Sequence, residues 1–172
     1  MRTIRTKVYK FNELNETAKQ KAIESNYDIN VMFGDWYESL YMDAENIGLK
    51  ITGFDIDGGN YCKGEFNLSA SEVAANIFRD HGEGCSTYKT ASAYMEEFNP
   101  VFSEYMNEDS DKYESVESEW KLQDMEDEFL KSLCEDYRIM LRNDYDYNTS
   151  KDVIIETIEA NEYEFTKEGN RF

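Results

Sequence analysis

The sequence predicts an α+β fold, in which a small antiparallel sheet of about four strands is covered by several helices. Apolar and polar residues alternate near both ends of the chain and beside a glycine-rich turn, as they do in strands with one wet face. Elsewhere apolar residues recur every three or four positions, the spacing of a helix with one buried face. One proline and nine glycines leave few flexible linkers. We therefore expect a single compact domain over 1–172, with a strand–helix–helix–hairpin part over 1–67 and a mainly helical acidic part over 68–172.

The N-terminal part is expected to begin with a strand. Residues 3–11 alternate between two faces, which indicates this strand. Asn15 then offers the side-chain oxygen that commonly caps a helix, so a helix is expected to start there. A second helix is expected over 34–47, and Gly48 is the residue type that ends helices.

A β-hairpin is the clearest strand signal in the chain. The apolar segment 49–56 leads into Asp-Gly-Gly-Asn at 57–60, and the segment 61–66 returns. Glycine and asparagine supply the positive φ angles that a tight turn requires. Ser69 and Glu72 then form a capping-box pattern, which predicts that a short helix follows the hairpin.

The rest of the chain is expected to be mostly helical. Helical spacing covers 87–107, where Pro100 is expected to interrupt it, and 112–142, the longest predicted helix. Thr149-Ser150 is expected to cap a further helix, and the alternating segment 163–167 could rejoin the first strand. The residues expected on the buried face of the longest helix are Val116, Trp120, Phe129, Leu133, Tyr137 and Leu141.

The net charge is the strongest indication of function. Thirty-seven acidic residues against eighteen basic ones give −19, whereas a small soluble domain usually carries a net charge of magnitude about 2–8. Excess like charge repels itself, and the aromatic content of 15% argues against a disordered acidic chain. Residues 1–99 carry −6 and residues 100–172 carry −13. We therefore expect a cationic partner that binds the C-terminal half.

The carboxylates of the longest helix suggest a binding surface. Successive acidic residues are spaced by 3, 7, 3, 1 and 7 positions, which places most of them near one stripe. Carboxylates on a rigid helix can imitate the phosphates of duplex DNA. For any one helix a solvated face is the better explanation, and it is the net charge of the whole chain that favours a binding surface. The candidate partner-binding residues are Glu114, Glu117, Asp124, Asp127, Glu128 and Glu135. Tyr145 and Tyr147 are expected to be exposed anchors beside them, with ordinary packing as the alternative.

The sequence supports a catalytic function less well than a binding function, and no cofactor or metal is expected. His81 is the single histidine, and its nearness to Cys85 suits a polar loop better than a Cys–His nucleophile. The segment 55–66 begins like a calcium loop, but Phe66 stands where such a loop requires Glu. The cluster 124–128 could hold a hard cation only weakly. No glycine-rich phosphate loop is found, and the charge opposes direct nucleic-acid binding.

The expected compartment is the cytoplasm. The basic N-terminus is not followed by the apolar segment of a signal peptide, and no run approaches the roughly 20 apolar residues of a membrane span. The three cysteines, Cys62, Cys85 and Cys134, are odd in number and far apart, which favours reduced thiols.

Two blocks of the first 85 residues or so carry a resemblance to a known group. Residues 7–23, KVYKFNELNETAKQKAI, and residues 51–66, ITGFDIDGGNYCKGEF, resemble blocks of small proteins from phages and mobile elements of gut bacteria. That group includes anti-CRISPR proteins that inhibit type II Cas nucleases. The resemblance implies a stoichiometric inhibitor with no catalytic residues, which binds a Cas nuclease and its guide RNA through an acidic, DNA-mimicking surface and blocks DNA binding or cleavage. An antitoxin-like regulator of another basic protein is the alternative, and an enzyme is the third reading.

Overall fold

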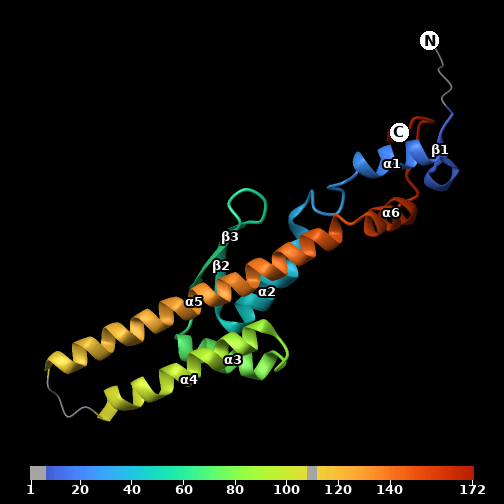
Figure 1. Ribbon diagram of the computed structural model, residues 1–172. Helices are drawn as coiled ribbons and strands as arrows, with labels where there is room; N and C mark the ends of the chain where they lie inside the picture. Colours follow the sequence, from blue (N-terminus) through green and yellow to red (C-terminus); the bar gives the residue numbers. More distant parts are fainter. Residues whose placement is uncertain (1–6, 108–111) are drawn as a thin grey trace. The chain divides into compact units, whose positions relative to one another are not determined.

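The computed structural model describes residues 7–107 and 112–172 (Figure 1). The predicted mixture of helices and antiparallel strands is confirmed, as is the long helix in the C-terminal half. The prediction of a single sheet is wrong in detail, since the strands of the described residues form two separate two-stranded sheets. Within the described residues, the strands near the chain ends pair with each other, where Phe165 also bridges Arg171, and the hairpin strands pair with each other.

The chain forms two compact units. Residues 1–37 and 143–172 make up one, which we call the terminal unit, and residues 38–142 make up the other, the central unit. The boundaries between these units fall near residues 37 and 142. The predicted parts 1–67 and 68–172 stay a prediction. The prediction that both belong to one domain stays a prediction.

The terminal unit joins the two ends of the chain. Strand β1 (Tyr9–Lys10) pairs antiparallel with β4 (Glu164–Phe165), so the closing segment rejoins the first strand as predicted. The described part of the first strand is short because the chain winds into a 3-10 turn, η1 (Phe11–Glu13), and residues 3–6 of the predicted strand lie outside the described residues. Helices α1 (Glu16–Glu24) and α6 (Lys151–Ala160) complete the unit. Its core consists of Phe11, Leu14, Ala18, Ala22, Ile23, Ile154, Ile158 and Phe165.

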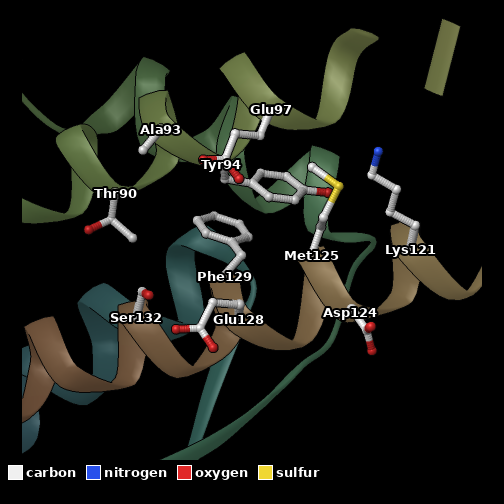
Figure 2. A pocket seen from close by; sticks show the side chains of 10 residues that line it. All are labelled: Thr90, Ala93, Tyr94, Glu97, Lys121, Asp124, Met125, Glu128, Phe129 and Ser132. Carbon is white, nitrogen blue, oxygen red and sulfur yellow. The ribbon is translucent and has the colours of Figure 1, made fainter. Parts of the chain in front are cut away.

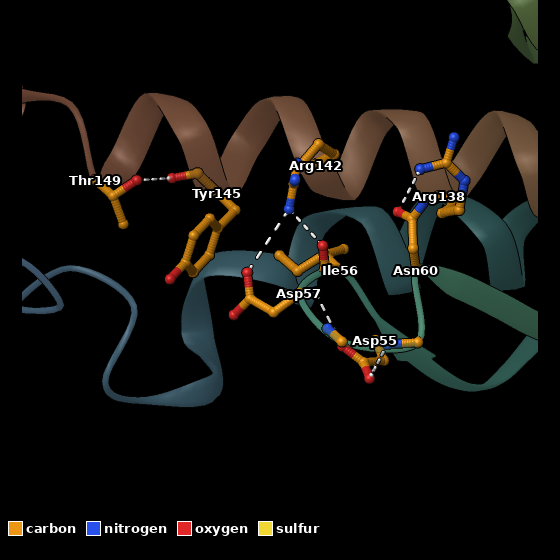
Figure 3. Close-up of polar contacts among 10 residues, drawn as sticks. Asp55, Ile56, Asp57, Asn60, Arg138, Arg142, Tyr145 and Thr149 are labelled. Carbon is orange, nitrogen blue, oxygen red and sulfur yellow. Dashed lines mark hydrogen bonds and ion pairs between the residues drawn. The ribbon is translucent and has the colours of Figure 1, made fainter.

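The helix caps of the terminal unit follow the sequence in part. The Asn15 side chain accepts a hydrogen bond from the Ala18 backbone N–H at 3.0 Å, which confirms the predicted cap of α1. Ser150 stands at the N-cap position of α6 but makes no side-chain cap hydrogen bond. The Thr149 hydroxyl instead donates to the backbone carbonyl of Tyr145 at 2.8 Å (Figure 3).

The first half of the central unit is a helix, a hairpin and a second helix. The predicted 34–47 helix is divided into a 3-10 turn, η2 (Gly34–Tyr37), which belongs to the terminal unit, and α2 (Glu38–Ile47). The hairpin is confirmed as β2 (Leu49–Asp55) and β3 (Tyr61–Phe66). The capping box is also confirmed, because Ser69 and Glu72 bond reciprocally at the start of α3 (Ala70–Asp80).

The second half of the central unit contains the two long helices, α4 (Ser86–Asn107) and α5 (Lys112–Asn148), of which α5 ends in the terminal unit. The predicted break at Pro100 is wrong, since α4 continues through it. Phe98 packs against a ring on each side of it along the helix, with ring centroids 5.1 Å from Tyr94 and 5.2 Å from Phe102. These contacts help to offset the backbone hydrogen bond that a proline removes.

Helix α5 buries one face, although not all of the predicted residues lie on it. Leu133, Tyr137 and Leu141 are fully buried, and Phe129 stacks on Tyr94 of α4 with a centroid distance of 4.2 Å. Trp120 is 73% exposed, so its predicted burial is wrong. It precedes Phe129 by nine residues, which is two and a half helical turns and therefore the opposite face. The side chain of Val116 lies outside the described residues.

We predict that Gly169→Ala destabilises the terminal unit. Gly169 is buried with a φ of +83°, and a Cβ there would meet the Ala18 carbonyl oxygen. We expect the free energy of unfolding to fall by about 1–3 kcal/mol. Trp120→Phe leaves Trp36, in the terminal unit, as the single tryptophan, so urea unfolding followed by its fluorescence reports on this unit. The neighbouring exposed change Glu168→Ala is the control, and an equal loss in both variants would contradict the prediction.

Candidate functional site

The negative charge of the chain is concentrated in the central unit. Residues 38–142 contain 24 Asp and Glu against 9 Lys and Arg, a formal net charge of −15. The terminal unit contains 13 against 9, a formal net charge of −4. Self-repulsion is therefore greatest in the central unit, and a cationic partner would gain most there.

Four of the predicted carboxylates form one exposed line on α5. Glu117, Asp124, Glu128 and Glu135 are spaced by 7, 4 and 7 residues, so they recur on one side of a helix with 3.6 residues per turn. All four are exposed, on the side of α5 opposite its buried face. We call these four residues the acidic ridge. The side chain of the fifth predicted residue on this line, Glu114, lies outside the described residues.

The ridge carboxylates differ in how far they are already neutralised. Arg138 donates two hydrogen bonds to Glu135, at 2.6 and 2.7 Å, and these lower the pKa of that carboxyl. Glu128 pairs with Lys131 at 3.2 Å, and both side chains are well exposed. Glu117 and Asp124 make no ion pair with any described residue. The ridge therefore offers two unpaired carboxylates and one weakly paired carboxylate to an incoming cation.

Asp127 lies to one side of the ridge. It accepts a hydrogen bond from the Gln123 side chain at 3.0 Å and borders a groove between α5 and the hairpin. Cys62 and Cys134 also line this groove, and all three cysteines are free, as the sequence predicts. The hydrogen bond between the two thiols, and then burial, raises the pKa of Cys62, whereas that bond lowers the pKa of Cys134.

A pocket of about 420 Å³ borders the other side of the ridge, between α4 and α5 (Figure 2). The stacked rings of Tyr94 and Phe129 lie in its wall together with Met125. Asp124 and Glu128 of the ridge line it as well. This pocket could not be predicted from the sequence, because it depends on how α4 packs against α5.

The hairpin turn is held against α5 by two arginines (Figure 3). Arg138 donates to the Asn60 side chain at 2.8 Å. Arg142 donates to the carbonyl of Ile56 and lies 3.7 Å from an Asp57 carboxylate oxygen. Arg142 is therefore engaged by the hairpin, and Arg138 joins the hairpin to the ridge residue Glu135.

The two predicted tyrosine anchors lie in the terminal unit and differ in exposure. Tyr147 is 65% exposed, as predicted. Tyr145 is half-buried and packs edge-on against Trp36, with ring centroids 5.7 Å apart, so its predicted exposure is wrong. An edge-to-face pair of this kind stabilises the unit that contains it. The role of either tyrosine in binding stays a prediction.

His81 belongs to a polar cluster that the sequence did not reveal. Its Nδ1 lies 2.7 Å from the Thr87 hydroxyl, and its Nε2 lies 3.4 Å from an Asp43 carboxylate oxygen. Asp43 also accepts a hydrogen bond from the buried Tyr137 hydroxyl at 2.7 Å. This order of carboxylate, imidazole and hydroxyl matches that of a hydrolase triad. Thr87, however, is only 2% exposed, so a substrate could not reach its hydroxyl.

Burial and the Asp43 hydrogen bond both raise the pKa of Tyr137, which keeps this hydroxyl a proton donor. These polar contacts thus connect α2, the α3–α4 connection and α5 inside the central unit. Over residues 7–107 and 112–172, no group of three or more His, Cys, Asp or Glu side chains could hold a metal ion.

No protein-family model matches the chain, and no curated protein or solved structure matches it either. In the part of the chain that the structure describes, no helix has both the length and the apolar character that crossing a membrane requires.

We predict that Asp55→Asn removes a pH-dependent part of the stability. Asp55 accepts backbone N–H bonds from Gly59 at 2.7 Å, Asp57 at 2.9 Å and Gly58 at 3.0 Å, and these lower its pKa from 3.8. The charged form therefore stabilises the fold fully above pH 3.8, and this stabilisation is lost as the pH falls through the folded-state pKa.

Urea midpoints from circular dichroism should separate wild type from Asp55→Asn near pH 6, and the gap should close below pH 3.8. Glu83→Gln changes an exposed side chain that has no hydrogen bond or ion pair among the described residues, and it should show no gap. A gap for Asp55→Asn that stays constant with pH would contradict the assignment.

Proposed function

We propose that the protein is a stoichiometric inhibitor of a basic nucleic-acid-binding protein, and specifically of a type II Cas nuclease with its guide RNA. It would act in the cytoplasm of the infected or host bacterium, without a cofactor, by blocking DNA binding or cleavage. The observation that carries the proposal is the exposed acidic ridge of α5 on a unit with a net charge of −15.

The length of the ridge supports imitation of a nucleic-acid backbone. From Glu117 to Glu135 the helix rises roughly 27 Å, at about 1.5 Å per residue. One strand of duplex DNA presents a phosphate about every 3.4 Å along its axis, or roughly eight over that length. The four ridge carboxylates are sparser than this, and Asp127 adds one beside them. The ridge thus carries negative charges along one line, as a row of phosphates does, but with fewer charges per unit length.

The electrostatics favour a fast, salt-sensitive encounter with a basic surface. Charge complementarity of this kind raises the association rate, and the effect falls as ionic strength rises. Because exposed ion pairs contribute about 0–1 kcal/mol, Glu128 can exchange Lys131 for a cation of the partner at little cost.

The proposed target has the matching surface. Cas effectors hold nucleic acid in positively charged channels and read a short flanking motif through arginine side chains. A rigid acidic helix bound in such a channel would occupy the place of DNA. The same negative charge repels free nucleic acid, so inhibition would come from contact with the protein and not from binding of its substrate.

We predict that neutralising the ridge weakens binding to the nuclease. The triple variant Glu117→Gln, Asp124→Asn, Glu128→Gln should lower affinity about tenfold at low salt, since each exposed carboxylate contributes up to about 1 kcal/mol. Pull-down and titration against guide-loaded and guide-free nuclease, with target DNA as competitor, would measure this.

The matched control places the same charge change on α6, as Asp152→Asn, Glu156→Gln, Glu159→Gln, where all three side chains are exposed. Equal weakening by both triples would contradict the ridge as the binding surface. Absence of binding to the nuclease in either guide state would contradict the proposed target. Binding to a basic partner that is not a nuclease would then favour the antitoxin-like alternative.

A further inference from the structure

The pocket between α4 and α5 combines an aromatic wall with an acidic rim (Figure 2). Its volume of about 420 Å³ falls in the range of about 300–1,000 Å³ that is typical of small-ligand sites. Tyr94 and Phe129 stack nearly parallel, at an interplanar angle of 3°, and Met125 contributes a flexible thioether. Tyr94 is only 6% exposed and Phe129 only 3%, so this wall is rigidly supported.

The charges of the rim are unbalanced. Glu97 of α4 and Asp124 and Glu128 of α5 face the pocket together with one cation, Lys121. Neither Glu97 nor Asp124 forms an ion pair with any described residue. The pocket therefore repels anions, and a neutral apolar group entering it would desolvate carboxylates without replacing their hydrogen bonds.

A guanidinium group on an aliphatic stem meets both requirements. Its methylene stem packs against apolar side chains, it is more weakly hydrated than an ammonium, and its fork of N–H donors matches a carboxylate. The methylene stem of an arginine can lie against Met125 while its head reaches Glu97 or Asp124. Lysine supplies the charge and the stem but not the fork, and its ammonium is more strongly hydrated.

We infer that this pocket receives an arginine side chain of the basic partner, and that it gives the acidic ridge a specific anchoring point. The inference rests on the proposed function, because it assumes a basic protein partner on this face of α5. Asp124 and Glu128 belong to both the ridge and the pocket, so a chain bound along the ridge can place an arginine in the pocket.

A small probe tests the pocket without any nuclease. The full chain, labelled with ¹³C at its methionine methyl groups, is titrated at low salt with N-acetyl-arginine methylamide. The neutral isostere N-acetyl-citrulline methylamide is the control ligand. The chain has seven methionines, and Met125→Leu assigns the relevant signal. We expect the arginine probe to change the chemical shift of the Met125 methyl saturably, with a dissociation constant in the millimolar range. The citrulline probe should bind at least fivefold more weakly, and the methyl of the exposed Met42 should not shift.

Three variants at the pocket and a control on α6 separate the pocket from general charge. Ala93→Phe at the exposed edge should fill the pocket and abolish the shifts while every carboxylate remains. The double variant Glu97→Gln, Asp124→Asn should weaken binding of the arginine probe at least fivefold, and Lys121→Gln should strengthen that binding. As the control, the double variant Asp152→Asn, Glu156→Gln on α6 should leave binding of the arginine probe unchanged. Equal shifts with both ligands, no shifts at all, or unaltered binding by Ala93→Phe would overturn the inference.

The nuclease experiment then distinguishes the two proposals. If the wild-type protein binds the nuclease and Ala93→Phe does not weaken that binding at least fivefold, the inference about the arginine pocket is wrong while the inhibitor function stands. If arginine binds the pocket and no nuclease binds, the pocket accepts arginine but the proposed partner is wrong, and the inference about that partner's side chain falls with it.

Discussion

The packing of one face of α5 into the core of the central unit is the constraint on which the candidate site depends. Phe129 stacks on Tyr94, and Leu133 and Tyr137 are fully buried behind it. Because a helix is rigid, fixing this face also fixes the opposite one, where the ridge carboxylates lie. The same stack forms the wall of the pocket, so burial, charge presentation and the cavity all follow from one helix–helix contact.

A unit with a net charge of −15 needs internal compensation to stay folded. The described contacts place the few cations where they hold elements together, since Arg142 binds the hairpin turn and Arg138 links Asn60 to Glu135. Asp55 is stabilised by backbone N–H groups without any cation. The fold thus satisfies structural carboxylates locally, and exposed carboxylates of α5 such as Glu117 and Asp124 are among those that no described cation compensates. That distribution is costly for folding alone and is useful if a cationic partner binds.

Local patterns allowed most elements to be predicted, and long-range packing explains the errors. The Asn15 cap, the capping box at Ser69 and the hairpin depend on neighbours within a few residues, and all are confirmed. The exposure of Trp120 and the partial burial of Tyr145 depend on which helix face meets the rest of the chain. The ridge could be anticipated because its spacing is local. The pocket and the Asp43–Tyr137 contact, between residues 94 positions apart, could not.

Charge alone is a poor basis for choosing a partner. A row of carboxylates attracts any basic surface, including the many nucleic-acid-binding proteins of a bacterial cell, and long-range attraction is weakened by salt. Specificity requires a contact that rewards one arrangement of cations over another. A pocket beside the ridge would do this, because only a correctly placed cation on an apolar stem could both fill it and pair with its carboxylates. The ridge would set the rate of encounter, and the pocket would decide which encounters last.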